Sequence, residues 1–240
     1  MRHIPDPQND AAHYEGGENL EIMLEAKNYN CFLRDLVRRF AVDTSSVLDF
    51  GAGIGTFSDS LGIPHSRVTC IETDTNAQAH LSSMGFKAYA NLSEIADGSF
   101  DYIFTLNVLE HIEDDGTAVS ELYRVLKPGG RLFVYVPAFE ILYSAMDTKV
   151  GHYRRYRIRG MTQLLQSVGF HIDRIAYTDP LGFLATLAYK VLDKNSNGVL
   201  NKSTVRFYDR YLFPISRILS LPLSRIIGKN LIAVAERPRG

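Results

Sequence analysis

The sequence predicts an α/β fold in which helices cover both faces of a mostly parallel sheet. Short apolar segments typical of strands alternate with helical patterns along most of the 240 residues, and such alternation builds parallel sheets that are buried on both sides. In addition, one apolar strand leads directly into a glycine-rich loop and then a helical pattern, at Val47–Phe57. A strand, glycine turn and helix in this order open the nucleotide-type sites of α/β proteins.

The individual elements follow in chain order from local patterns. Residues 1–17 are polar and look like a flexible lead, and apolar residues at helical spacing from about Asn19 to Phe40 predict an amphipathic helix or a pair of helices. We then expect strands near 46–50, 67–72, 86–90, 100–106 and 131–137, with helices near 55–62, 76–84 and 114–126 between them. A helix near 159–168, a strand near 171–178 and a last strand at 231–235 complete the series.

Composition bounds the class of protein. A chain that is 45% hydrophobic and 22% charged can bury the core of one ordinary domain. A net charge of −1 gives no electrostatic reason to expect a nucleic-acid partner. Cys31 and Cys70 form no metal-spaced pair, and no signal peptide or membrane-spanning run is visible. These features favour a cytoplasmic protein with reduced thiols.

The glycine loop discriminates between nucleotide cofactors. Glycine allows positive φ and close approach of the backbone to a ligand, but the third glycine of the dinucleotide fingerprint would fall at Thr56, and the loop has Gly55 instead. A pyrophosphate would also meet the carboxylate of Asp49. S-adenosylmethionine has no phosphate and fits this loop better. Glu72 ends the next strand, 23 positions after Asp49, where a carboxylate can accept hydrogen bonds from ribose hydroxyls.

Four ordered blocks carry a family resemblance. They are the loop at 47–57, the strand at 68–74, the segment at 100–112 and the segment at 122–137 with its Lys-Pro-Gly-Gly turn. With these blocks the sequence resembles the class I S-adenosylmethionine-dependent methyltransferases. Residues 146–156 resemble, more loosely, a bacterial branch associated with glycan and secondary-metabolite biosynthesis. The resemblance implies a Rossmann-like seven-stranded methyltransferase sheet whose last strand is antiparallel, S-adenosylmethionine as cofactor and S-adenosylhomocysteine as product.

The resemblance also implies a cofactor site spread over the first strands. Asn91 stands where an acidic residue near the adenine is often found, so contact with the adenine is an open question. The full set of expected cofactor-binding residues is Tyr29, Asp49, Gly51, Ala52, Gly53, Gly55, Thr56, Glu72, Thr73, Asn91, Leu92, Asn107, Val108 and His111.

Two histidines are candidates for the catalytic base. His111 and His152 follow the fourth and fifth strands, at the carboxyl edge where ligands bind in such folds, and histidine titrates near neutral pH. His111 could alternatively line the cofactor or open a helix. We predict His111, His152 and Tyr153 as catalytic residues.

The segment around His152 is also the predicted binding site for the methyl acceptor. Arg154 and Arg155 stand between tyrosines, and forked guanidinium donors suit a phosphate, carboxylate or sugar. The alternative is that both arginines form structural ion pairs while the tyrosines pack. The expected substrate-binding residues are His152, Tyr153, Arg154, Arg155 and Tyr156.

No metal site is expected. Glu113, Asp114 and Asp115 form an acidic run, and acidic residues at a helix start are explained by the helix dipole.

About fifty residues, Asp179 to Asn230, stand where the resemblance implies a short hairpin. Their length and apolar content predict helices that cap the acceptor pocket, with a wall made by Leu181, Phe183, Leu184 and Tyr211. A subunit contact and a membrane-surface or lipid contact are the alternatives. The single domain then divides into a lead and helical lid at 1–45, a cofactor-binding core at 46–178, this insertion at 179–230, and a last strand and tail at 231–240.

The predicted function is methyl transfer from S-adenosylmethionine, most simply to oxygen on a small molecule such as a sugar or glycan-linked intermediate. N-methylation, a catalytically silent cofactor-binding or scaffold protein, and a nucleotide-dependent dehydrogenase are the alternatives, the last disfavoured by Thr56. The protein is expected to be a monomer or homodimer.

Overall fold

The computed structural model describes residues 22, 25–41, 44, 46–192 and 201–239 and is built around a seven-stranded sheet of order β3-β2-β1-β4-β5-β7-β6. The first five strands of this order are parallel, and β7 runs antiparallel to both of its neighbours. The prediction of a mostly parallel sheet with an antiparallel last strand is thus confirmed. The strands are β1 (Val47–Phe50), β2 (Val68–Ile71), β3 (Lys87–Tyr89), β4 (Phe100–Leu106), β5 (Leu126–Pro137), β6 (His171–Thr178) and β7 (Asn230–Glu236).

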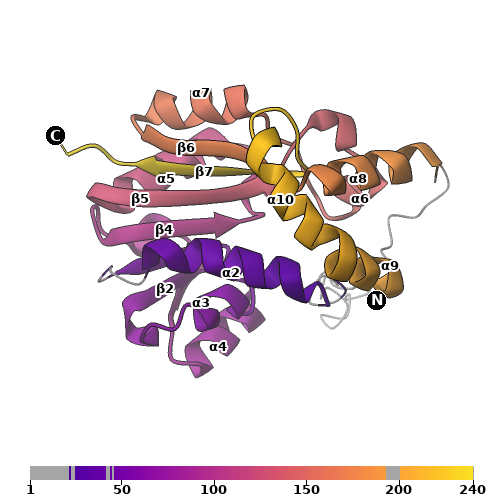
Figure 1. Cartoon of the computed structure of the whole chain (residues 1–240). Helices are drawn as coiled ribbons and strands as arrows, with labels where there is room; N and C mark the ends of the chain where they lie inside the picture. Colours follow the sequence, from indigo (N-terminus) through magenta and orange to yellow (C-terminus); the bar gives the residue numbers. More distant parts are fainter. Residues whose placement is uncertain (1–21, 23–24, 42–43, 45, 193–200, 240) are drawn as a thin grey trace, which may run out of the picture.

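Helices cover both faces of the sheet (Figure 1). On one face lie α2 (Lys27–Ala41), α3 (Thr56–Ser60) and α4 (Thr75–Ser83), and on the other lie α5 (Asp115–Val125) and α7 (Ile158–Val168). Strand β4 serves both cores, because side chains alternate across a strand: Ile103 enters one hydrophobic cluster, while Tyr102 and Phe104 enter the other.

Two boundaries differ from the sequence-based expectation. The described part of the N-terminal helix α2 begins at Lys27, whereas the helical pattern was expected from about Asn19, and most of residues 19–24 lie outside the described residues. Strand β5 begins at Leu126 and not at Arg131, because Leu126 pairs with Phe100 across a register shift and Gly129 takes a φ of +80° within the strand.

The register brings the ends of β1 and β2 together. Phe50 pairs with Ile71, so the next residues, Gly51 and Glu72, leave the sheet at the same edge. Short helical segments follow the carboxyl ends of β3, β4 and β5. They are η2 (Leu92–Glu94), η3 (Leu109–His111), η4 (Glu140–Leu142) and α6 (Ala145–Lys149), whereas η1 (His65–Arg67) precedes β2 at the opposite edge.

The insertion before β7 is helical, as predicted. It contains α8 (Pro180–Leu192), α9 (Lys202–Phe207), a π-helical turn η5 (Tyr208–Leu212) and α10 (Phe213–Leu223). These helices gather at the end of the sheet toward which the arrowheads of β4 and β5 point (Figure 1). The insertion therefore lies beside the edge where ligands bind in α/β sheets.

Asp179 ties the parts of the insertion together. This residue has a φ of +62° and is 5% exposed. Its carboxylate accepts hydrogen bonds from the Gly182 amide at 3.0 Å, from Ser216 Oγ at 2.6 Å and from the Tyr208 hydroxyl. One buried carboxylate thus joins α8, η5 and α10.

A second aspartate joins the insertion to the N-terminal helix. Asp209 accepts hydrogen bonds from the backbone amides of Asn28 and Tyr29, both at 2.9 Å. These amides belong to the first turn of α2, which has no acidic residue of its own. Because the first amides of a helix have no partner within it, Asp209 caps α2 from 181 residues along the chain.

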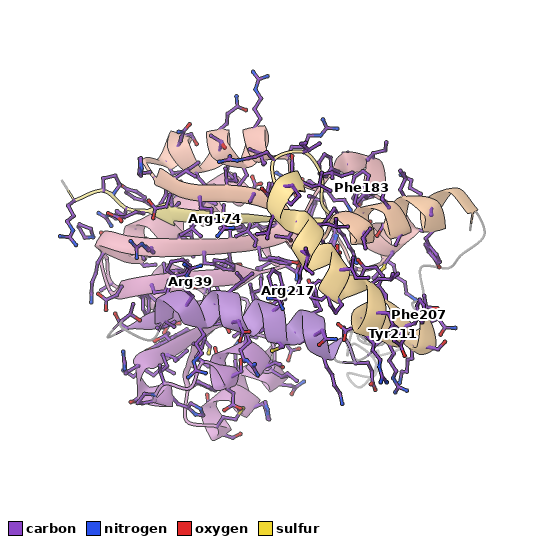
Figure 2. The ribbon with its side chains drawn as sticks, viewed as in Figure 1. Arg39, Arg174, Phe183, Phe207, Tyr211 and Arg217 are labelled. Carbon is purple, nitrogen blue, oxygen red and sulfur yellow. The ribbon has the colours of Figure 1, made fainter. Side chains whose placement is uncertain are left out.

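The outer side of α9, η5 and α10 is apolar and exposed. Phe207 and Tyr211 are 58% and 54% exposed, and they lie on the outer side of these helices in Figure 2. Leu184, an expected wall residue, is 53% exposed, whereas Phe183 is buried and its ring lies 5.2 Å from that of Phe139. The cap over an acceptor remains a prediction, and only Phe183 of these residues is covered by protein. No helix in the described ranges has the length and apolarity needed to cross a membrane.

Candidate functional site

The glycine loop leaves room for a ligand at one position. Gly51, Gly53 and Gly55 have φ values of +83°, +54° and +83°. A Cβ on Gly51 would lie 2.2 Å from Val108 Cγ2, so this glycine is needed for packing. A Cβ on Gly53 would meet nothing within 4 Å, so the space in front of this residue is open. The loop therefore offers a bare backbone surface at Gly53, as expected of a ligand-binding turn.

Glu72 borders this open space. Its Oε2 accepts the amide of Gly53 at 2.8 Å, and its Oε1 accepts the amide of Asp74 at 2.9 Å. Two backbone hydrogen bonds fix the carboxylate. Oε2 retains a second lone pair for a ligand donor, whereas Oε1 also accepts a long hydrogen bond of 3.4 Å from the Thr73 hydroxyl. Glu72 is thus held beside the loop in a geometry suited to hydroxyl groups.

Asp49 lies beneath the loop and is 3% exposed. Its Oδ2 accepts a hydrogen bond from Ser58 Oγ at 2.7 Å. Burial raises the pKa of Asp49 to about 7, against the opposing effect of the Ser58 hydrogen bond. The expected contact of this carboxylate with a ligand cation stays a prediction.

Three further expected residues meet at the end of β4. Asn107 has a φ of +54°, and its amide donates to the carbonyl of Tyr135 at 2.8 Å. Tyr29 of α2 lies beside Tyr135, and the two ring centroids are 6.3 Å apart. Val108 packs against the glycine loop. The structure therefore brings Tyr29, Asn107 and Val108 to one edge with the loop.

The other expected cofactor residues have local roles that are visible in the structure. Asn91 caps η2 by accepting the Ser93 amide at 2.9 Å, and Leu92 is buried. Thr56 is the first residue of α3, Ala52 donates its amide to the Ile71 carbonyl at 3.0 Å, and Thr73 donates to Glu72 at 3.4 Å.

A cluster of Glu110, His111 and His152 lies just past the end of β4. The His111 and His152 rings are 4.5 Å apart at 81°, and His152 Nε2 lies 3.9 Å from Glu110 Oε1. Glu110 is fully buried, and neither carboxylate oxygen has a hydrogen-bond partner among the described residues. On the far side of the ring, His152 Nδ1 lies 2.8 Å from Asp147 Oδ1. The two predicted histidines are thus brought together, next to a buried carboxylate.

The surroundings shift the pKa values of this cluster strongly. Burial raises the pKa of Glu110 to about 8. Burial and the neighbouring His152 lower the pKa of His111 to about 4. Burial alone would raise the pKa of Asp147, but hydrogen bonds from His152 and Arg155 lower it to about 2. Such displaced values are typical of functional sites.

The two arginines expected to bind the acceptor are already engaged. Arg155 contacts both oxygens of Asp147, with Nε 2.8 Å from Oδ1 and Nη2 3.0 Å from Oδ2, and its side chain is 8% exposed. Arg154 pairs with Asp115 at 3.1 Å. The structural ion-pair alternative therefore describes both arginines in this structure. The neighbouring Tyr156 donates to Asp115 at 2.8 Å, whereas Tyr153 is 54% exposed.

Glu110 and Asp147 were missing from the sequence-based site. Glu110 could have been included, because it stands next to the predicted site residue His111, a few residues after the strand expected at 100–106. Asp147 carried a weaker signal, because its bonds to Ser144 form a capping box that explains the residue without function.

Comparison with known proteins points to one class of enzyme. A family described as a methyltransferase domain matches residues 48–134. A probable S-adenosylmethionine-dependent methyltransferase from Mycolicibacterium smegmatis is 29% identical over 167 residues, which cover 67% of this chain and 63% of that protein. A ubiquinone biosynthesis O-methyltransferase from Dechloromonas aromatica is 31% identical over 98 residues, 37% of this chain and 42% of that one. The chain thus spans less than two thirds of these relatives' length.

Solved structures of similar fold include a possible histamine N-methyltransferase from Thermotoga maritima. It has a TM-score of 0.63 and 16% identity and covers 92% of this chain and 95% of its own. The [4+2]-cyclase SpnF has a TM-score of 0.59 and 19% identity, with 87% of this chain and 81% of that chain covered. At such identities the likeness shows the fold alone.

Proposed function

We propose that the chain is a class I S-adenosylmethionine-dependent methyltransferase, which the methyltransferase-domain match at residues 48–134 supports, and that it transfers the methyl group of S-adenosylmethionine to a small-molecule acceptor. The observation that carries the proposal is the open backbone at Gly53 beside the fixed carboxylate of Glu72.

The residues at the loop fit this cofactor. Gly53 lets the backbone approach the ligand without a side chain in the way, and a Cβ there would project into the open space. The unused lone pair of Glu72 Oε2 suits a hydroxyl of a ribose. In the proposed site Gly51, Gly53 and Gly55 form the floor, Glu72 takes the ribose, and Tyr29, Asn107 and Val108 form the side toward β4.

The remaining chemistry belongs to the acceptor side. When bound, S-adenosylmethionine supplies an electrophilic methyl group on a sulfonium. The protein must hold the acceptor in line with that methyl group and keep the site dry, and alignment of this kind is worth up to about 7–11 kcal/mol. Glu110, His111 and His152 are the polar groups gathered past β4, and we assign them to the acceptor oxygen, with Tyr153 beside them.

We infer that the acceptor atom is oxygen, on a hydroxyl compound such as a sugar or glycan-linked intermediate. The named O-methyltransferase among the relatives supports oxygen, whereas the named N-methyltransferase among the structural neighbours keeps nitrogen as the alternative. The helical insertion beside the carboxyl edge supports a cap over this acceptor. A protein that binds the cofactor without turnover is the second alternative, and only a product measurement distinguishes it.

Calorimetry with S-adenosylhomocysteine tests the cradle. In the proposed site, Glu72→Ala removes a charged hydrogen-bond acceptor and weakens binding by on the order of 1.5–3 kcal/mol. Glu94→Ala is the matched control, because Glu94 is an exposed glutamate in η2. The Glu94→Ala protein should bind S-adenosylhomocysteine with the affinity of the wild type. Equal affinity of a folded Glu72→Ala protein, or tighter binding of NAD, contradicts the assignment.

Turnover is tested with methyl-labelled S-adenosylmethionine and a fractionated cell extract, followed by mass identification of the labelled product. A labelled hydroxyl compound supports O-methylation, and a labelled amine supports the nitrogen alternative. Tight binding of the cofactor without any labelled product supports the catalytically silent alternative.

A further inference from the structure

The cluster past β4 contains three ligand atoms of the kind that hold metal ions. One atom each from Glu110, His111 and His152 lies within 4.8 Å of the others. Glu110 is fully buried, yet both of its carboxylate oxygens lack a hydrogen-bond partner among the described residues. A buried carboxylate without any partner is costly and requires an explanation.

The outer nitrogen of the His152 ring is already engaged. His152 Nδ1 lies 2.8 Å from Asp147 Oδ1. A ring nitrogen bonded to a carboxylate or carbonyl carries the proton, so the other nitrogen of a neutral ring has a free lone pair. The interior of the cluster therefore gathers the Glu110 carboxyl and two imidazole rings, and a bound cation would give the buried oxygens of Glu110 a partner.

The second layer of contacts has the form found around metal ligands. A histidine that binds a metal almost always donates its other N–H to a carboxylate or a backbone carbonyl, which fixes the orientation of the ring. Asp147 does this for His152 and is itself held by two bonds from Arg155 and one from the Ser144 amide at 2.9 Å.

We propose that Glu110, His111 and His152 bind a divalent transition-metal ion. Two imidazoles and a carboxylate form the ligand set of catalytic zinc sites, which keep a position open for water or substrate. Ligand atoms about 2.1 Å from a tetrahedral ion lie about 3.4 Å from one another. The 4.8 Å spread therefore closes by up to about 1.4 Å on metal binding, through rotations of the three side chains.

The ion gives the cluster a role that rests on the proposed function. A hydroxyl oxygen bound at an open metal position has a lowered pKa. Its proton passes to solvent, its electron pair forms the new bond to the methyl carbon, and the electrons of the broken carbon–sulfur bond remain on the sulfur of S-adenosylhomocysteine. The proposal revises our expectation of no metal, which was drawn from Glu113, Asp114 and Asp115, residues outside the cluster.

Zinc binding by the untagged full chain is the test. The protein is stripped by dialysis against a chelator, titrated with ZnCl2 in competition with a chromophoric chelator, and its metal content is measured by mass spectrometry. We expect one equivalent of bound zinc, and at least a tenfold loss of affinity in His152→Asn and in Glu110→Gln. Asp147→Asn should lose about 10–100-fold by releasing the His152 ring. His171→Asn, an exposed histidine on β6, should bind like the wild type.

Substitution with Co²⁺ provides a second readout, because its visible absorption changes when imidazole and carboxylate ligands replace water. The proposal is overturned if the wild type takes up no zinc, or if His111→Asn and His152→Asn bind as much as the wild type. Should Glu110→Gln fail to fold, the two histidine variants and Asp147→Asn decide the result. Calorimetry with S-adenosylhomocysteine on the same samples separates the two proposals. A protein that binds S-adenosylhomocysteine but no zinc contradicts the metal site alone and leaves the proposed cofactor site standing.

Discussion

Comparing substitutions of Gly53 and Gly98 tests whether a ligand occupies the open space at Gly53. Both have positive φ, +54° and +59°, and a Cβ on either would meet nothing within 4 Å. Backbone strain from a side chain should therefore be similar at the two positions. Only Gly53 lies beside Glu72, so a side chain there should obstruct a ligand.

We expect Gly53→Leu to weaken S-adenosylhomocysteine binding at least tenfold in calorimetry. Gly98→Leu should bind normally while losing a comparable amount of stability in urea unfolding. Similar affinity in the two variants would mean that the space at Gly53 is not used by the cofactor.

Asp49 gives a pH prediction at the same scale. Its pKa is raised by burial from an unfolded value of about 3.9 to about 7 in the folded protein. The folded state therefore favours the protonated carboxyl of Asp49. The resulting contribution to the free energy of unfolding is fully present below about pH 4 and is lost as the pH rises through 7. Within that window the loss is about 1.4 kcal/mol for each pH unit.

Urea unfolding between pH 5 and pH 7.5 should thus show the wild type losing stability relative to Asp49→Asn, which cannot ionise. A difference between the two proteins that stays constant with pH would show that Asp49 is already ionised in the fold.

At the scale of elements, helix α2 depends on a cap from the insertion. The first turn of α2 contains no acidic residue, and Asp209 accepts two of its amides. Loss of an N-cap costs about 0.5–2 kcal/mol, so Asp209→Ala should lower the free energy of unfolding by that amount. Asp35→Ala is the control within α2 itself, because Asp35 is an exposed residue whose ion pair with Arg34 is also exposed. If both variants unfold at the same urea concentration, the cap does not stabilise the helix.

Elements were predictable where their signals are local. The strand–glycine–helix unit at Val47–Phe57 and the acidic residue after β2 follow from a few adjacent residues, and their hydrogen bonds close within 19 residues. The cap on α2 could not be predicted in this way, because Asp209 and Asn28 are 181 residues apart. The sequence around each of them contains no motif that indicates the contact. The pairing of Arg155 with Asp147 was equally hidden, since a double arginine suits a ligand as well as a carboxylate.

At the scale of the whole molecule, Phe213 packs the insertion against the N-terminal helix α2. Phe213 is 2% exposed, and its ring lies 5.5 Å from Tyr29 and 5.7 Å from Phe32 of α2. Arg217, between α10 and α2 in Figure 2, adds a cation 5.0 Å from the Phe32 ring. These contacts join two segments from opposite ends of the sequence.

Phe213→Ala should therefore lower the free energy of unfolding by about 3–5 kcal/mol, as deletion of a buried aromatic ring does. Phe207→Ala removes the same ring from a site in the same insertion that is 58% exposed and should change stability by less than about 0.5 kcal/mol. Differential scanning calorimetry of the two variants checks this. Equal midpoints would mean that the insertion unfolds independently of the core.

The bond between Asp209 and the start of α2 has a consequence for how acceptor range can change in such proteins. The helices of the insertion are not structurally independent of the N-terminal segment, because Asp209 holds the first turn of the helix that carries Tyr29. A chimera that receives the insertion of a relative must also receive that relative's segment corresponding to residues 22–41. Evolution of a new acceptor therefore requires matched changes near both ends of the chain.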